Sequence, residues 1–421
     1  ISNVNLIDGT GNPLQANVSI GIREGKIIAT DSSINEHAKN EIDGTGKFLI
    51  PGLFDCHVHT NDFESDFPKY VHYGVTSIFI TGGSLCTNEY YAAMRAHGNQ
   101  DTIPAPIVFH TSQHFTMEGR HPVKTYKGNW IDGKSVFFLK DTLQIESLVK
   151  EVTQYPIVGI KLTIEEGPNP PWVERIPQEF INKVQKEATK NSTEVFAHVS
   201  DNIELEMAMN AGIQNLVHWT GIDLDFQRDT ILVDKIYGVK PSFISTLMID
   251  KGFLYPLFPE WLEDLRLEGV FDEDYLEKAD DPRYLARARD LMGFWKDYLK
   301  KDEVTLKDIA SFQVDDIKVL TKNGIIFALG TDTGFFVLPG YSLHEEMQLF
   351  ELGGMDQLDI IKMTTLNAAK MMHAQDSLGS IENGKIANMI LLDKNPLESI
   401  SNTLAINKVI KRGVIQKRIK E

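Results

Sequence analysis

Hydrophobic residues in the central part of the chain gather into short runs that alternate with amphipathic stretches. Apolar, β-branched runs of this kind predict strands, and eight of them occur in order, at 53–59, 74–83, 104–112, 157–164, 194–200, 214–219, 238–244 and 324–330. Helical spacing predicts helices between most of them, including 142–153, 178–190 and 202–211. This alternation favours an α/β fold in which eight parallel strands form a (β/α)8 TIM barrel.

Both ends of the chain have a different pattern, made of short strands and turns. The pattern predicts several such strands within residues 1–48. It predicts one more strand at 385–393 and a hairpin at 408–415. Two β-rich ends around an alternating centre predict that the termini pair. We therefore expect a small β-sandwich domain from 1–48 and 380–421, beside a TIM-barrel catalytic domain at 49–379.

The connection from about 245 to 323 is long, charged and mostly helical in pattern. It follows the seventh expected strand, on the face where barrel active sites lie. We expect a helical insertion here, and both a substrate lid and a decorative insertion remain open.

The composition is that of a globular protein and argues against two classes of partner. Hydrophobic residues make up 42% and charged residues 24% of the 421 positions. The formal net charge of −17 argues against nucleic acid as a partner. The apolar runs are much shorter than a membrane span, so we expect none.

The compartment stays open from the sequence. The two cysteines, Cys56 and Cys86, indicate no disulfide framework and do not distinguish oxidising from reducing surroundings. The chain begins at Ile1 inside an expected strand, as it would after trimming of its N-terminus. Cytoplasmic and exported localisation are therefore both open.

The first central strand ends in Asp55-Cys56-His57-Val58-His59. Alternate residues of a strand point the same way, so this His-x-His pair aims two imidazoles at one point. A metal ion needs such convergence. Taken alone, the pair also fits a structural histidine beside a surface histidine.

Further candidate ligands follow on the later strands. Lys161 lies in the apolar fourth strand, where a lysine is costly unless it is paired or modified. His198 ends the fifth strand, His218 ends the sixth, and Asp332 follows the eighth. Each has a structural reading of its own, as a hydrogen-bonded histidine, a paired lysine or an Asx-turn. Together they fall on the rim where barrel enzymes place their catalytic groups.

These residues in this order resemble the amidohydrolase superfamily. The resemblance covers essentially the whole chain and includes the segments 52–59, 366–370 and 379–389. Within the superfamily, the sequence is most similar to the binuclear, metal-dependent branch that contains imidazolonepropionase-like and prolidase-like or carboxypeptidase-like enzymes.

The resemblance implies two divalent metal ions, and zinc suits the histidine and carboxylate ligands best. The implied ligands are His57, His59, Lys161, His198, His218 and Asp332. The His-x-His pair and Asp332 would bind the more buried ion, and His198 and His218 the more exposed one. Lys161 would be N6-carboxylated by CO₂ and bridge the two ions. A carbamate would also explain why the lysine can be buried, because two cations would neutralise the negative charge of the carbamate.

Two ions that share a water lower its pKa enough to supply hydroxide near neutral pH. The resemblance implies attack of this hydroxide on a carbonyl, with Asp332 as the catalytic residue that passes the proton to the leaving amine. We therefore expect a metal-dependent hydrolase that cleaves the C–N amide bond of a small molecule, a dipeptide or an N-acyl amino acid. Relatives often self-associate, so the resemblance also suggests a homo-oligomer.

Three other functions compete with this one. A mononuclear cyclic-amide hydrolase or deaminase, imidazolonepropionase-like, usually lacks the fourth-strand lysine, so Lys161 argues against it. A lactonase or phosphotriesterase-type hydrolase stays open, because metal hydroxide attacks all these centres. A scaffold without catalysis should lack ligands, whereas all six positions here carry usable side chains.

Four residues are weaker candidates for substrate binding: His121, Arg120, Tyr237 and Ser242. The segment 116–121 resembles the Gly-Gly-His segment of the prolidase-like branch, with Arg120 in place of the second glycine. His121 would contact a substrate carbonyl or carboxylate, and Arg120 could hold a carboxylate through a bidentate pair. A plain surface loop is the alternative. Tyr237 and Ser242 bracket the seventh strand and would line the pocket.

Overall fold

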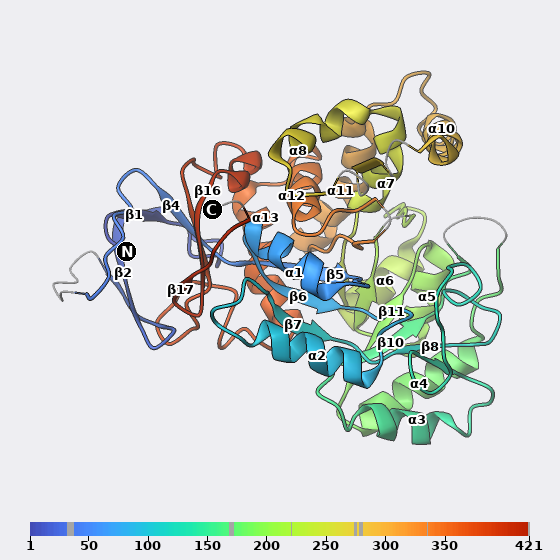
Figure 1. The fold of residues 1–421 in the computed structure, drawn as a ribbon. Coiled ribbons are helices and arrows are strands. Elements are labelled where there is room, and N and C mark those ends of the chain that lie inside the picture. The colour runs from blue at the N-terminus through green and yellow to red at the C-terminus, as the bar shows by residue number, and fades with distance from the viewer. Residues whose placement is uncertain are drawn as a thin grey trace.

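The two ends of the chain and its centre form separate sheets (Figure 1). The computed structural model describes residues 1–31, 38–167, 172–219, 221–272, 276–277, 281–334 and 336–419. No helix in these ranges combines the length and the apolar character that a membrane crossing requires.

Both ends contribute strands to one seven-stranded sheet, in the order β17-β16-β15-β4-β1-β2-β3. Its strands are β1 (Val4–Leu6), β2 (Gln15–Arg23), β3 (Lys26–Asp31), β4 (Phe48–Pro51), β15 (Met389–Leu392), β16 (Ile406–Lys411) and β17 (Val414–Ile415). β4 and β15 pair antiparallel, with Ile50 opposite Ile390, which joins the blue and red ends of the chain in Figure 1. The termini therefore pair as predicted, while the second layer of a sandwich stays a prediction.

The eight central strands predicted from the sequence all occur, in the same order. They are β5 (Leu53–Val58), β6 (Val75–Ile80), β7 (Ile107–His110), β10 (Gly159–Thr163), β11 (Glu194–His198), β12 (Asn215–Val217), β13 (Ser242–Ile244) and β14 (Ile326–Ala328). Two short strands, β8 (His114–Thr116) and β9 (Val136–Phe138), follow β7. The strands form two sheets, β14-β13-β12-β11-β10-β8-β9 and β5-β6-β7, and every pairing within them is parallel.

Backbone hydrogen bonds join these two sheets at both edges. The Cys56 amide donates to the Leu329 carbonyl at 3.0 Å, beside β14. At the other edge, the Val158 amide donates to the His110 carbonyl at 2.9 Å, beside β10. The arrangement is consistent with the predicted barrel, and it places the end of β5 beside the end of β14.

Most connections between the central strands are helices that cover the sheets. They are α1 (Phe63–His72), α2 (Asn88–Gly98), α3 (Ile145–Val152), α4 (Gln178–Lys190), α5 (Asn202–Ala211), α6 (Thr230–Val239) and α11 (Leu306–Lys322). The sequence marks their ends: Asp201 caps α5 and Gly212 ends it in the left-handed conformation. Thr305 and Asp308 form a capping box at the start of α11.

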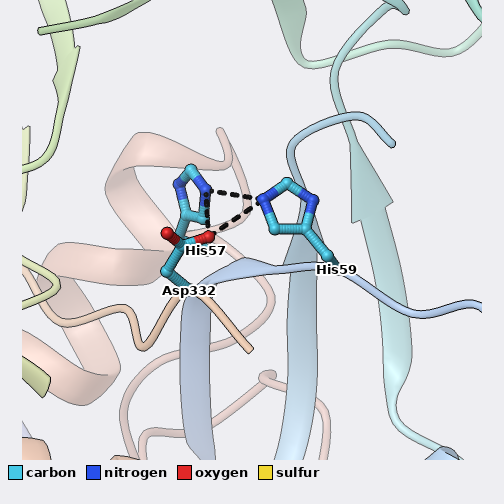
Figure 2. Close-up of side chains that lie close together, drawn as sticks. All are labelled: His57, His59 and Asp332. Atoms are coloured by element: carbon cyan, nitrogen blue, oxygen red, sulfur yellow. Dashed lines mark hydrogen bonds and ion pairs between the residues drawn. The ribbon is translucent and has the colours of Figure 1, made fainter. Parts of the chain in front are cut away.

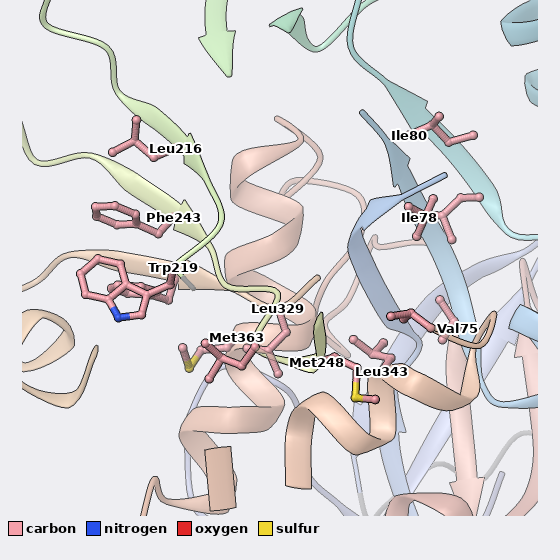
Figure 3. Close-up of a cluster of buried hydrophobic side chains, with 14 of the residues drawn as sticks. Val75, Ile78, Ile80, Leu216, Trp219, Phe243, Met248, Leu329, Leu343 and Met363 are labelled. Carbon is pink, nitrogen blue, oxygen red and sulfur yellow. The ribbon is translucent and has the colours of Figure 1, made fainter. Parts of the chain in front are cut away.

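The main apolar core surrounds the parallel strands (Figure 3). Val75, Ile78 and Ile80 of β6 lie in the same cluster as Leu216 of β12 and Phe243 of β13. The last helical elements pack against the strands before the chain returns to the end sheet: α12 (Tyr341–Leu352), α13 (Gln357–Lys362), the π-helical turn η3 (Met363–Asn367), α14 (Ala368–Met371) and η4 (Ile400–Leu404).

The connection after β13 is helical, as its pattern predicts. It contains α7 (Met248–Leu254), η1 (Tyr255–Leu257), η2 (Pro259–Leu262), α8 (Glu263–Glu268) and α10 (Pro282–Leu299). Leu254, Trp295 and Ile309 form a small buried cluster of their own in this region. These helices therefore have a local core, and α10 packs against α7 and η1.

A buried carboxyl group lies where this insertion meets α11. Asp250 of α7 accepts a hydrogen bond from Gln313 Nε2 of α11 at 2.9 Å. Burial raises the pKa of Asp250 to about 7. Because the folded protein holds this proton more tightly than the unfolded chain does, the group lowers the free energy of unfolding as pH rises from about 4 to about 7.

We expect Asp250→Asn to be more stable than the wild type at neutral pH, because the amide oxygen can still accept from Gln313 and carries no charge. The advantage should widen by about 2–3 kcal/mol between pH 5 and pH 8. Urea unfolding at the two pH values measures it. A variant that is the less stable protein at pH 8 would show that the charged form of Asp250 is the favoured one.

Candidate metal centre

Three side chains from the first and last central strands meet at one point (Figure 2). His57 is in β5, His59 follows it directly, and Asp332 follows β14. The Nε2 atoms of the two histidines lie 3.1 Å apart, and Asp332 Oδ1 lies 3.2 and 3.0 Å from them. On a tetrahedral zinc ion with Zn–N distances of about 2.0 Å, two donor atoms lie about 3.3 Å apart. The three donors therefore have the spacing of one face of a metal site.

The hydrogen bond of His59 shows which of its nitrogens is free to bind. His59 Nδ1 lies 2.7 Å from the Gly82 carbonyl oxygen. A carbonyl only accepts, so Nδ1 carries the proton and Nε2 presents its lone pair to the other two side chains. Gly82 has a φ of +99°, and a Cβ there would lie 2.4 Å from His114 Nε2. Glycine is therefore required at position 82, whose carbonyl oxygen points at His59 Nδ1.

Burial keeps His57 in the neutral form that binds metals. The side chain is 1% exposed, and this desolvation lowers its pKa to about 3. A neutral imidazole has one nitrogen lone pair, the form in which histidine is a metal ligand.

His198 and His218 form a second donor pair beside the first. His198 Nδ1 lies 3.1 Å from His218 Nε2, and the rings of His57 and His218 are 4.7 Å apart. His218 Nδ1 lies 2.7 Å from the Thr246 hydroxyl oxygen. If Nδ1 donates to that oxygen, Nε2 carries the lone pair, as in the first group. Burial lowers the pKa of both imidazoles well below the usual range.

Lys161 provides a buried amine whose charge is compensated only in part, by the nearby carboxylates of Asp332 and Glu165. It lies in β10, and among the described residues its Nζ has no hydrogen-bond partner. Burial lowers the pKa of Lys161 to about 7, so a large share of the amine is neutral near pH 7. A neutral amine is the form that reacts with CO₂, and an isolated buried ammonium is costly. A carbamate between two cations would fit this position.

The backbone is strained at three of the strand ends that carry this site. His218, Thr246 and Asp332 have φ values of 79°, 59° and 61°. Residues with a Cβ rarely adopt this region, and such outliers cluster at functional sites. The three residues follow the adjacent strands β12, β13 and β14, so the strain lies where side chains are aimed into one centre.

Two of the predicted substrate residues have protein partners. His121 is buried, with Nε2 3.1 Å from Glu165 Oε2 and Nδ1 2.5 Å from Thr125 Oγ1. Its ring lies 5.1 Å from that of His198, so it is close to the donor pair. Arg120 contacts Glu174 Oε2 at 2.6 Å and donates to the Arg175 carbonyl at 3.1 Å. The Arg120 guanidinium is therefore engaged by the protein itself.

The other two predicted substrate residues lie away from the two donor groups, and their contact with substrate stays a prediction. Ser242 is the first residue of β13 and lines a cavity with Glu194, Asn215 and Lys240. These residues are at the start of the strands, opposite the end that carries His218. Tyr237 is in the last turn of α6, which leads into that same end of β13. Thr246 is the residue that follows β13 at the site.

Two acidic residues at the centre have no role in the sequence-based prediction. The Asp55 carboxylate accepts from the Thr331 hydroxyl and amide at 2.6 and 3.0 Å, which fastens β5 to the loop after β14. Glu165 Oε2 contacts His198 and His121, and these three residues form a second group that could hold a metal ion. The sequence signal for Glu165 is its place just past β10, on the same rim as Lys161.

Comparisons with known proteins agree with this picture. A sequence model described as the amidohydrolase family matches residues 48–416. Ochratoxinase from Aspergillus niger is 25% identical and the match covers 94% of this chain and 81% of that one. Imidazolonepropionase from Caldanaerobacter subterraneus subsp. tengcongensis is 24% identical, over 93% of this chain and 88% of that one. The crystal structure of a Xaa-Pro dipeptidase with bound methionine is similar in fold, with a TM-score of 0.70 and 20% identity over 99% and 98% of the two chains.

Proposed function

The chain belongs to the amidohydrolase family and is a hydrolase that acts on carbon–nitrogen bonds, and from this premise we propose that it cleaves the amide bond of a dipeptide or an N-acyl amino acid at a centre of two divalent metal ions. The observation that carries the proposal is the geometry of the two donor groups. Each brings nitrogen donors to 3.1 Å from one another. In the forms that present a lone pair on each facing nitrogen, the two would repel unless a cation lay between them.

We assign the ligands as follows. His57, His59 and Asp332 would hold the first ion, and His198 and His218 the second. The carboxylated amine of Lys161 would bridge the two, which accounts for its burial. Zinc fits this set of nitrogen and oxygen donors.

When bound, the two ions would supply hydroxide near neutral pH and polarise the substrate carbonyl. The protein's part is to aim the ligands and move the proton. Asp332 contacts both imidazoles through Oδ1, and we assign to its carboxylate the transfer of a proton from the attacking water to the leaving amine.

We propose the same domain organisation that the sequence predicts. The central strands would close into a TIM barrel at 49–379, supported by the hydrogen bonds at both edges of the parallel sheets. Residues 1–48 and 380–421 would form the β-sandwich domain, supported by the pairing of β4 with β15. The helices within 245–323 would be an insertion of the barrel.

The dipeptide substrate is supported by similarity in fold to a Xaa-Pro dipeptidase and to a prolidase complexed with N-methylphosphonate-L-proline. The amide class is also that of the family. The remaining classes, cyclic amides and lactones or phosphotriesters, are outcomes of the test below.

We expect protein purified without chelator to contain about two metal ions per chain by elemental analysis. It should hydrolyse Xaa-Pro dipeptides or N-acyl amino acids in a panel that also contains lactones, phosphotriesters and cyclic amides. Chelation should abolish the activity and added zinc should restore it. About one ion per chain would contradict the bridged centre. Activity confined to lactones, phosphotriesters or cyclic amides would overturn the substrate class.

A further inference from the structure

One buried carboxylate beside the centre has no part in the proposed reaction. Glu165 lies in the loop after β10 and is 3% exposed. Its Oε2 atom is 2.5 Å from His198 Nε2 and 3.1 Å from His121 Nε2. A buried carboxylate needs compensating partners, and these two imidazoles lie within ion-pair distance of Oε2.

The contact with Glu165 determines which nitrogen of His198 can bind a metal ion. A neutral imidazole has one N–H and one lone pair. If the ionised Glu165 carboxylate accepts from Nε2 at this 2.5 Å contact, the N–H of His198 lies on Nε2 and its lone pair on Nδ1. Nδ1 is the atom that faces His218 Nε2 at 3.1 Å. In that arrangement, Glu165 favours the form of His198 that completes the second donor pair.

The partner of His198 differs in charge from the partners of His59 and His218. His59 is held by the Gly82 carbonyl and His218 lies against the Thr246 hydroxyl. Both of these partners are neutral oxygens. A carboxylate partner makes a metal-bound imidazole more basic and fixes its ring more firmly than a neutral oxygen does.

We propose that Glu165 is a positioning residue for the second metal ion, acting through the orientation and basicity of His198. His121 braces the carboxylate from its other side, through Nε2, while its own Nδ1 lies against Thr125. This inference rests on the proposed two-ion centre. It also assigns His121 to the support of Glu165, in place of the predicted contact with substrate.

The proposal predicts an effect on one ion only. Glu165→Gln keeps the size of the side chain and removes its charge, so the second ion should bind about 10–100-fold more weakly. The first ion, at His57, His59 and Asp332, should keep its affinity. Glu166→Gln is the matched control, because the neighbouring Glu166 pairs with Arg175 at 2.9 Å and contacts no ligand histidine.

The experiment titrates Co²⁺ into chelator-treated protein and follows heat and visible absorption. The wild type should show two binding steps, of which only the weaker-binding step and its absorption band should change in Glu165→Gln. Unchanged affinities and spectrum would overturn the proposal, and so would equal weakening of both steps. Three ions per wild-type chain would also overturn it, since the third would lie on His121, Glu165 and His198.

The outcomes separate this inference from the proposed function. One ion per wild-type chain would overturn the two-ion centre itself. Two ions in the wild type, with Glu165→Gln indistinguishable from Glu166→Gln, would overturn only the role of Glu165. If the glutamine variant does not fold, Glu165→Asp, which keeps a negative charge on the loop, takes its place in the Co²⁺ titration. It should bind the second ion more tightly than Glu165→Ala, and the reverse order would contradict the proposal.

Discussion

Lys161→Met is expected to lower the hydrolytic activity by at least about 10³-fold while it stabilises the metal-free protein by about 1–3 kcal/mol. The loss of activity follows from the loss of the proposed bridging ligand and with it of the proposed two-ion centre. The gain in stability follows because the Lys161 amine is buried without a hydrogen-bond partner among the described residues. Methionine has a similar length and buries no charge. Amide hydrolysis and urea unfolding in chelator measure the two effects.

A loss of activity together with a gain in stability distinguishes this role of Lys161 from that of an ordinary structural lysine. If the nearby carboxylates of Asp332 and Glu165 fully compensated the charge of Lys161, its replacement would lower the stability of the protein and leave the metal content unchanged. Lys161→Ala is the companion variant, because it leaves a cavity that a small carboxylate can enter. Acetate or propionate should restore part of its activity by standing in for the carbamate. Lys161→Met fills the same space, so the same acids should not rescue it.

Asp332→Asn is expected to reduce kcat by about 10³–10⁴-fold, the range of a lost proton transfer combined with a lost charged ligand. The amide cannot take up a proton, and it holds a cation less strongly than a carboxylate does. The Oδ1 contacts with His57 and His59, at 3.2 and 3.0 Å, can be kept by the amide oxygen. The variant should therefore fold, and steady-state kinetics with elemental analysis should show the loss in kcat.

Asp55→Asn is the matched control for this variant. Asp55 is buried at the same centre, but its carboxylate binds Thr331 and the His57 amide, and it contacts no imidazole nitrogen in the described hydrogen bonds. Its replacement should lower the unfolding temperature and leave about two ions bound. If Asp332→Asn keeps its full metal content and more than a tenth of the wild-type kcat, Asp332 does not carry out the proton transfer.

Much of the centre could be predicted because strand geometry is regular. Alternation along β5 brings His57 and His59 to one side, and parallel strands bring His198 and His218 to the same rim. Asp332 is far from these residues in sequence, and it joins them because β14 lies beside β5. The expected convergence of these side chains therefore needed only the order of the strands, and each proposed ligand lies in a strand or shortly after it.

The substrate residues could not be predicted because they depend on where strands begin and on loops. The apolar run from 238 to 244 gives no sign that α6 continues to Val239 and that β13 starts at Ser242. Because β13 starts at Ser242, this residue lies at the far end of the strand, and Thr246 is the residue that lies beside His218. Glu165 and Glu166 are adjacent acids in one loop, yet only Glu165 meets histidines. The difference arises from partners on other strands, which local sequence does not encode.

The pairing of β4 with β15 has a consequence for the order of events during protein synthesis. About 340 residues separate these two strands, so at 5–20 residues per second β4 lacks its neighbour for roughly 17–70 s after it is translated. Asp332 likewise emerges long after His57 and His59. A nascent chain therefore carries an unpaired edge of β4 until β15 has been translated. The three donors of the proposed first ion can therefore meet only after Asp332 has been translated.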